Sequence, residues 1–148
     1  MRIAVCLALF FGYFFPPGKT RTIDYNGKAV NTTYDVPLYF YGVYEGHKEG
    51  FLKLNEDGTG IYRYDVFGFA LGSCKDGEIR MEWGFLVDEN DSLVAFDREY
   101  GKSYPLLMKS VSDTQFQGCR KEVMLDFVMV YENGKLGVSS SDDWEKTK

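Results

Sequence analysis

This sequence has few of the residues on which most catalytic and metal sites depend. It contains a single histidine, His47, and no pair of cysteines in a Cys-x-x-Cys arrangement. Within one chain, neither a zinc site of two cysteines and two histidines nor a catalytic site of three histidines can therefore be assembled. His47 lies in a charged stretch between two glycines, where a solvated loop residue is expected rather than a catalytic base. We predict that the protein is not an enzyme and uses no metal or cofactor.

A calcium-binding loop and an excess of positive charge are also missing. Asn55, Asp57 and Thr59 alternate like the first ligands of an EF-hand. Val66, however, stands at the twelfth position, where a glutamate is required, so we expect a tight β-turn there. Lysine and arginine number 17 against 22 acidic residues, which gives a net charge of −5. Because proteins that bind nucleic acids gather positive charge, we expect no nucleic-acid partner.

Long apolar runs are absent except at the N-terminus. Arg2 is followed by an uncharged run from Ile3 to Phe15, and Pro16-Pro17-Gly18 ends it. The run is shorter than the ~20 residues needed to span a bilayer, so a signal peptide over residues 1–18 is favoured over a permanent membrane helix. We therefore expect an exported protein, periplasmic or extracellular, with no integral membrane span after signal removal.

What the sequence does have is aromatic residues and alternating apolar patterns. Aromatics make up 17% of the 148 residues, a length that suits one domain. Over 79–87, the apolar residues Ile79, Met81, Trp83, Phe85 and Val87 alternate with mostly polar or small neighbours, as in a half-buried β-strand. Similar stretches between Gly, Asn and Asp turns predict strands near 38–44, 51–55, 60–67, 78–87, 92–97, 102–109, 114–118, 122–131 and 135–138.

Residues 19–37 are predicted to form an N-terminal hairpin or a loose arm. Asn26-Gly27 suits a type I′ turn because both residues tolerate positive φ. Residues 38–148 then form one all-β domain, either a sandwich or a barrel, and closure into a barrel removes exposed strand edges. Asp126, within an apolar strand, is expected to face outward rather than to be a buried functional carboxylate.

Several segments resemble the small exported lipocalin-like proteins of bacteria, within the wider calycin group. The resemblance covers roughly residues 38–145 and rests on 42–46, 51–60, 77–83, 104–108, 112–114, 133–136 and 140–144. Tyr44, in Gly42-Val43-Tyr44, stands where lipocalins usually carry a tryptophan. The resemblance implies an antiparallel up-and-down β-barrel of about eight strands with an apolar ligand in its mouth.

Two functions remain open. The first is a non-catalytic barrel that binds a small apolar or amphipathic ligand, with a wall of Tyr62, Tyr64, Met81, Trp83, Phe85, Phe127 and Met129. The second is a cell-surface or periplasmic interaction module, an inhibitor or accessory subunit with a filled barrel. This module would bind a protein partner through Tyr39-Phe40-Tyr41 or through the apolar segment 66–71.

Two cysteines remain once the signal peptide is removed. In an exported chain, Cys74 and Cys119 form either a disulfide or two free thiols, and both alternatives stay open. A bridge would close a loop of about 45 residues and stabilise the fold by roughly 4 kcal/mol.

Overall fold

The described residues fold into antiparallel strands that all belong to one sheet. The computed structural model describes residues 18–46, 50–63, 78–99, 101–116, 118–132, 135–139 and 144–147. The strands are β1 (Thr20–Tyr25), β2 (Lys28–Thr33), β3 (Gly42–Glu45), β4 (Phe51–Leu54), β5 (Thr59–Arg63), β6 (Glu78–Leu86), β7 (Phe96–Arg98), β8 (Gly101–Ser110), β9 (Glu122–Glu132), β10 (Lys135–Ser139) and β11 (Trp144–Lys146). A 3-10 turn, η1 (Leu38–Phe40), precedes β3. The predicted all-β, antiparallel fold class is confirmed.

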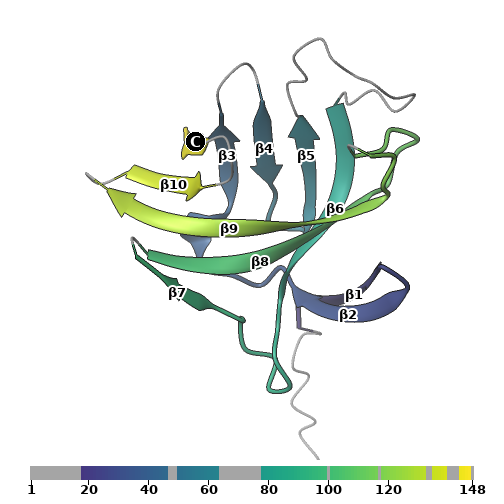
Figure 1. Ribbon diagram of the computed structural model, residues 1–148, viewed down its shortest axis with the longest axis horizontal. Coiled ribbons are helices and arrows are strands. Elements are labelled where there is room, and N and C mark those ends of the chain that lie inside the picture. The colour runs from purple at the N-terminus through teal and green to yellow at the C-terminus, as the bar shows by residue number, and fades with distance from the viewer. Residues whose placement is uncertain are drawn as a thin grey trace, which may run out of the picture.

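The sheet follows the order β1-β2-β6-β5-β4-β3-β11-β10-β9-β8-β7, with an additional pairing between β6 and β8. Strands β3 to β6 stand side by side, and β8, β9 and β10 cross in front of them (Figure 1). β11 returns to β3 through the pairs Glu145↔Glu45 and Lys146↔Tyr44. The strands from β3 to β6 and from β8 to β11 therefore each have a neighbour on both sides.

β6 is the central strand, and its sequence alternation is confirmed. Ile79, Met81, Trp83 and Phe85 are at most 1% exposed, whereas Arg80 between them is exposed. β6 pairs with β5 in its first half, with β8 in its second half and with β2 at its end. Apolar side chains from several strands therefore meet along the same face of β6.

Pro105 lies inside β8 at the point where that strand changes partner. β8 pairs with β7 up to Ser103 and with β6 from Leu106, while β9 runs along its other edge throughout. Because proline has no backbone N–H, a strand interior tolerates it only where no ladder bond is required on that side. The gap between the two partners provides such a position.

The predicted hairpin is confirmed in β1 and β2. Asn26 and Gly27 have φ of 50° and 75°, as a type I′ turn requires. β2 continues the sheet beside the end of β6, where a Cβ on Gly84 would lie 2.3 Å from Thr32 Oγ1. Arg21 of β1 donates a 3.0 Å hydrogen bond to the Gly58 carbonyl. The hairpin is therefore docked on the sheet rather than a loose arm.

The predicted strand at 38–44 begins later, at Gly42, because the preceding residues form η1. The Phe40 N–H donates to the Pro37 carbonyl at 2.9 Å, and the Tyr41 N–H donates to the Leu38 carbonyl at 3.3 Å. These local bonds replace the ladder bonds of a strand.

Two further predicted strands are also wrong or displaced. The strand predicted at 92–97 is displaced, since β7 begins at Phe96 and ends at Arg98, and Leu93 forms an isolated bridge with Val87. No strand forms in the described part of 114–118. Gly118 and Cys119 have positive φ and turn the chain back, which leaves a single bridge between Phe116 and Arg120.

Candidate functional site

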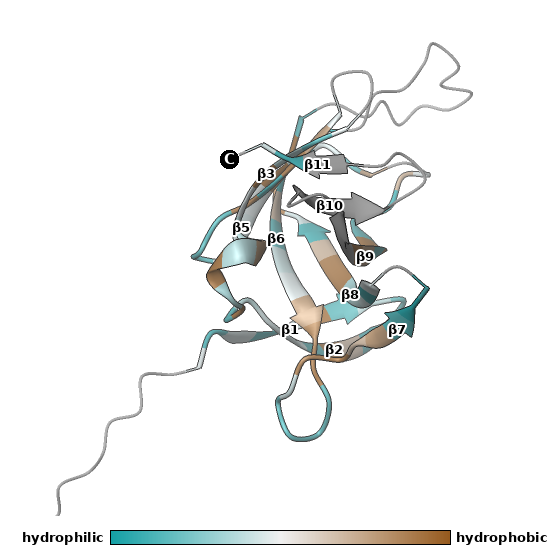
Figure 2. Cartoon of the chain, turned by 90° about the vertical axis from the view of Figure 1, so that its left-hand side faces the viewer, coloured by the Kyte–Doolittle hydropathy of each residue, from teal (hydrophilic) through white to brown (hydrophobic). Residues whose placement is uncertain are grey.

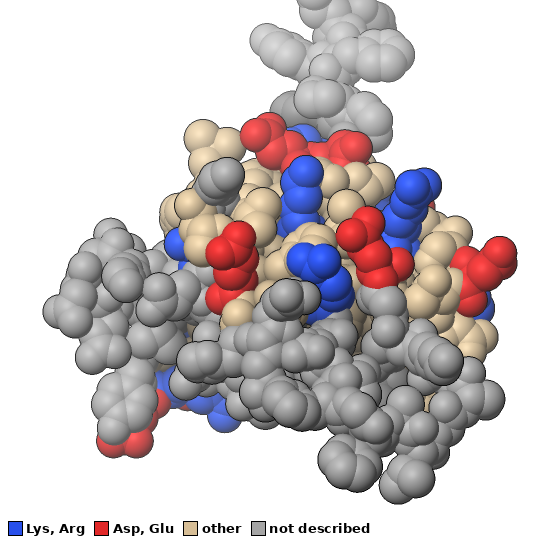
Figure 3. Space-filling model, turned by 90° about the horizontal axis from the view of Figure 1, so that it is seen from above, with Lys and Arg blue, Asp and Glu red and all other residues tan. Residues whose placement is uncertain are grey.

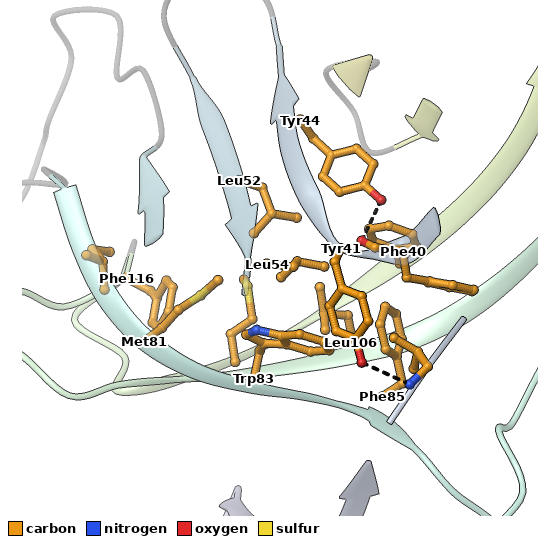
Figure 4. Close-up of a cluster of buried hydrophobic side chains, with 14 residues drawn as sticks. Phe40, Tyr41, Tyr44, Leu52, Leu54, Met81, Trp83, Phe85, Leu106 and Phe116 are labelled. Atoms are coloured by element: carbon orange, nitrogen blue, oxygen red, sulfur yellow. Dashed lines mark hydrogen bonds between the residues drawn. The ribbon is translucent and has the colours of Figure 1, made fainter. Parts of the chain in front are cut away.

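The structure brings together four of the residues predicted to line a ligand cavity. Met81, Trp83, Phe85 and Phe127 are all fully buried in one apolar cluster (Figure 4). Tyr62 is partly buried and packs against this cluster. Tyr64 and the side chain of Met129 lie outside the described part of the structure. The cluster consists of Val36, Phe40, Tyr41, Tyr44, Leu52, Leu54, Ile79, Met81, Trp83, Phe85, Leu106, Met108, Phe116 and Phe127.

One end of the cluster is closed by Phe40, which comes from η1 rather than from a strand. Its ring centroid lies 5.2 Å from that of Phe85, 5.2 Å from that of Tyr104 and 5.8 Å from that of Phe127. Such separations are typical of packed aromatic rings. Phe40 therefore occupies the space between β6, β8 and β9 at this end.

The prediction that Tyr39-Phe40-Tyr41 is an exposed aromatic run is wrong for Phe40 and Tyr41. Phe40 is 1% exposed and Tyr41 is 8% exposed, whereas Tyr39 is 52% exposed. The tight turn of η1 sends successive side chains in different directions, so only Tyr39 of the three remains available to a partner.

Buried tyrosine hydroxyls fix η1 on the sheet. Tyr44 donates a 2.7 Å hydrogen bond to the Phe40 carbonyl, and its ring packs edge-on against Phe127 at 5.4 Å. Burial raises the pKa of the Tyr44 hydroxyl far above its ordinary value, so the group stays neutral and donates. Tyr41 donates a 2.7 Å bond to the Tyr34 carbonyl. Tyr44 thus has a structural role.

Trp83 occupies the middle of the cluster with its polar atom satisfied. The indole Nε1 donates a 2.8 Å hydrogen bond to the Thr59 carbonyl. Edge-on contacts to Tyr34 at 6.5 Å and Tyr41 at 6.0 Å surround the ring. A Cβ on Gly60 would lie 3.2 Å from Trp83 Cδ1, so a glycine allows β5 to approach the ring closely.

The other end of the cluster is closed by Phe116, from the connection between β8 and β9. Phe116 is 1% exposed and its ring lies 5.5 Å from that of Tyr62. In Figure 4, Phe116 lies beside Met81, at the opposite end of the cluster from Phe40 and Tyr44. The sequence predicted a strand over 114–118 but did not single out Phe116, because alternation over so short a stretch does not show which side chain turns inward.

The connection that carries Phe116 is held by its own hydrogen bonds. Phe116 and Arg120 exchange backbone bonds of 2.9 and 3.3 Å, and Ser110 Oγ donates to the Thr114 carbonyl at 2.6 Å. Cys119, in the same connection, is disulfide-bonded. Cys74 lies outside the described residues, so the pairing of these two cysteines stays a prediction.

The charged residues that the sequence singled out have structural partners. Arg98 Nη2 on β7 lies 2.6 Å from Asp126 Oδ2 on β9, and both side chains are half-exposed, so Asp126 faces outward as predicted. Asp57 Oδ1 accepts from the hydroxyl and the N–H of Thr59 at 2.6 and 2.9 Å, which lowers the pKa of Asp57. These bonds form the predicted tight β-turn. The remaining residue of this group, His47, lies outside the described residues.

Acidic and basic side chains alternate over the described surface seen from above, without a large field of one sign (Figure 3). Among the described residues, no group of three His, Cys, Asp or Glu side chains is placed to hold a metal ion. In the described part of the chain, the large hydrophobic residues that remain exposed are Leu38, Tyr39, Phe96 and Val111. The apolar segment 66–71 lies outside the described residues.

No protein-family model, curated protein or solved structure matches this chain. In the part of the chain that the structure describes, none of the helical segments has the length and apolar character needed to cross a bilayer.

Proposed function

We propose that the protein is an exported, lipocalin-like β-barrel whose interior is filled by its own side chains. In this proposal, residues 1–18 are the signal peptide and residues 38–148 form the barrel. The protein acts without catalysis, in the periplasm or outside the cell, as an interaction module such as an inhibitor or an accessory subunit. Its partner contacts lie on the surface of the barrel.

Strand pairing supports the barrel. β8 pairs with β6 over five residue pairs, from Met81↔Ser110 to Phe85↔Leu106. β11 pairs with β3, and the Thr147 N–H extends this ladder with a 2.8 Å bond to the Val43 carbonyl. These two pairings join the series β3 to β6 with the series β8 to β11 at both margins. A small eight-stranded barrel has an interior that side chains can fill.

The observation that carries the proposal is the insertion of one phenylalanine from each end. Phe40 and Phe116 are each 1% exposed, and both come from connections rather than strands. Between them lie Met81, Trp83 and Phe85, three of the seven residues predicted to line a ligand cavity. Aromatic side chains packed at van der Waals separation exclude a ligand from the space they occupy.

Three described groups with shifted pKa values, Tyr44, Asp57 and Lys146, support a non-catalytic role, because each is engaged in holding the fold. The hydroxyl of Tyr44 bonds the Phe40 carbonyl, and the carboxylate of Asp57 bonds Thr59 within a turn. Lys146, whose pKa is lowered by burial, bonds the carbonyl of Tyr39. Catalytic groups with shifted pKa values are instead oriented toward a substrate.

Binding of a small apolar ligand is a second candidate, and Phe116 favours it. Because Phe116 belongs to a connection, movement of the residues between Val111 and Lys121 would withdraw its ring from Tyr62 while the bonds from Val111 to Arg80 and from Ser110 to Lys121 stay in place. A ligand of similar shape would then fit against Tyr62 and the end of β6. This candidate requires a ligand-bound form in which Phe116 has moved.

Native mass spectrometry of the protein, purified mildly from an exporting host, tests the proposal. We expect the mass of the polypeptide alone, equal to that of a denatured aliquot run as the control. A stoichiometric lipid-like adduct that disappears on denaturation would overturn the filled interior and establish the ligand-binding barrel. In that case, extraction of the adduct would give its chemical class.

A further inference from the structure

Two strands of the described sheet, β1 and β7, have a neighbouring strand on one side only. β7 has three residues, whereas β1 has six and contains no proline and no residue with positive φ. Proteins usually protect an edge strand by making it short or by interrupting it with a bulge or a proline. Figure 2 shows β1 and β2 together at the lower end of the molecule, away from β10 and β11. β1 is therefore the longer open edge of the described sheet.

The register of the hairpin determines which backbone groups of β1 point away from β2. In a hairpin with a two-residue turn, the residues that flank the turn exchange hydrogen bonds, and bonded and unbonded pairs then alternate along the ladder. Tyr25 flanks the turn, so Thr22 and Asp24 belong to unbonded pairs. Asn31, opposite Thr22, likewise turns its carbonyl away from β1 and accepts from the Val87 N–H at 3.4 Å. The N–H and C=O groups of Thr22 and Asp24 therefore point outward from the open edge.

β1 is held in place through the side chains that alternate with these two residues. Ile23 is 2% exposed, and Arg21 donates a 3.0 Å hydrogen bond to the Gly58 carbonyl. The side chains of Thr22 and Asp24 are exposed on the opposite face of the strand. A strand that is already ordered loses little conformational entropy when another strand pairs with it. The backbone groups of the edge are thus arranged in advance for a further strand.

Asp24 gives the edge a preference for one kind of strand. In an antiparallel pair, the residue opposite Asp24 would lie about 5.5 Å away between Cα atoms, where an opposite charge stabilises the pair and a like charge destabilises it. In an antiparallel pair of two β1 strands, Asp24 would face Thr20, Thr22 or another Asp24, because these residues belong to the unbonded pairs. A second copy of the chain therefore offers no basic residue to Asp24, whereas a different protein can.

We propose that the open edge of β1 binds an extended segment of a partner protein as an added antiparallel strand. The inference rests on the proposed function and extends it, because it places a partner contact on the N-terminal hairpin and names the form of the partner. Thr22 and Asp24 supply the backbone hydrogen bonds of the new ladder, and the partner segment carries a lysine or an arginine opposite Asp24. The backbone bonds provide affinity, and the charged pair fixes the register.

Peptide selection tests this edge. The probe is a phage-displayed library of short random peptides, selected against the protein and resynthesised for titration. Thr22→Pro removes an outward N–H and leaves the ladder to β2 intact, because Thr22 donates no bond in that ladder. Thr22→Ala is the matched control, since both variants lose the 3.1 Å bond from the Thr22 hydroxyl to Asn31 Oδ1. Thermal unfolding shows whether each variant is folded.

We expect the selected peptides to carry a lysine or an arginine and to bind Thr22→Pro roughly tenfold more weakly than Thr22→Ala. Asp24→Lys, which leaves the backbone unchanged, should weaken binding several-fold, and replacing the basic residue of the peptide by glutamate should restore it. In the complex with the parent protein, hydrogen exchange of the Thr22 and Asp24 amides should become slower.

Failure to select any peptide, equal binding to Thr22→Pro and Thr22→Ala, or slower exchange only at other residues would each overturn the added strand. A dimer of the protein that Thr22→Pro dissociates and Thr22→Ala does not would assign the edge to a second copy and overturn the partner proposed here. None of these outcomes bears on the filled interior, which native mass spectrometry tests separately.

Discussion

Lys146 and Tyr39 are joined by a hydrogen bond across 107 positions of the chain. The Lys146 ammonium donates at 2.8 Å to the Tyr39 carbonyl. Tyr44 and Lys146 therefore bind adjacent carbonyls of η1, those of Phe40 and Tyr39. Partial burial lowers the pKa of Lys146. β11 thus holds the turn that carries Phe40 into the core.

Replacing Lys146 by methionine should lower the free energy of unfolding by about 1 kcal/mol, because the bond to the Tyr39 carbonyl is lost while the aliphatic stem is kept. Urea unfolding measures the change. Lys102→Met, at an exposed position on β8, removes the same charge and should leave the midpoint nearly unchanged. Equal midpoints for the two variants would show that the bond does not stabilise η1.

Phe116→Ala should cost about 3–5 kcal/mol, since it removes a fully buried ring and leaves a cavity beside Tyr62. The matched variant is Phe96→Ala, because Phe96 is 51% exposed and its truncation should cost under about 1 kcal/mol. Saturating benzene should raise the midpoint of Phe116→Ala alone, because an apolar cavity binds an apolar guest. A small loss for Phe116→Ala would mean that this end of the interior is not filled by Phe116.

Gly84→Ala should destabilise the fold by about 1–3 kcal/mol through overpacking between β6 and the N-terminal hairpin. The new Cβ would lie 2.3 Å from Thr32 Oγ1 and 2.6 Å from Thr32 Cβ, and threonine is stiff at χ1. Both variants are made in the unprocessed chain, where Gly18→Ala is the control, since its nearest neighbour would be 3.9 Å away. Thermal unfolding of both variants checks the prediction. An unchanged midpoint for Gly84→Ala would show that the hairpin shifts to accommodate the new Cβ without loss of stability.

The stability contributed by the neutral Tyr44 hydroxyl should decline above pH 10. Burial raises the pKa of Tyr44 above the ordinary value of 10.0, so the unfolded chain loses this proton first. The folded state then binds more protons, and the free energy of unfolding falls as pH rises from the unfolded pKa toward the folded pKa.

Tyr44→Phe isolates this contribution. At about pH 8 the variant should be less stable than the parent by about 1 kcal/mol, because the bond to the Phe40 carbonyl is lost. At about pH 11 the difference should shrink, since only the parent has Tyr44 to titrate. Tyr104, whose pKa burial also raises, remains in both proteins and cancels in the comparison. If the difference in stability between parent and variant stays constant with pH, the pKa of Tyr44 is not raised in the folded state.

Local patterns were sufficient to predict much of the sheet. The alternation of Ile79, Met81, Trp83 and Phe85 predicted one buried face, because side chains on a strand alternate between its two faces. Asn26-Gly27 predicted its turn from backbone preference alone. Both features depend on residues close together in sequence.

The closing residues of the core could not be predicted in the same way. Phe40 and Phe116 lie in connections, where no period indicates which side chain turns inward. Pro37 precedes a 3-10 turn in a stretch where apolar residues predicted a strand. Cys119 turns the chain beside the predicted strand 114–118, which does not form in the described residues. Whether the space inside the sheet is filled by side chains depends on contacts between residues distant in sequence, such as Phe40 and Phe127.

The pairing of β11 with β3 also sets an order of events during synthesis. β3 is made well before β11, because the bond from Thr147 to the Val43 carbonyl spans 104 residues and cannot form until residue 147 has been added. Until then, one edge of β3 has unpaired backbone groups, which can recruit strands of other chains. A chain truncated before residue 144 would therefore keep this edge of β3 unpaired, so β11 protects the edge against pairing with other chains.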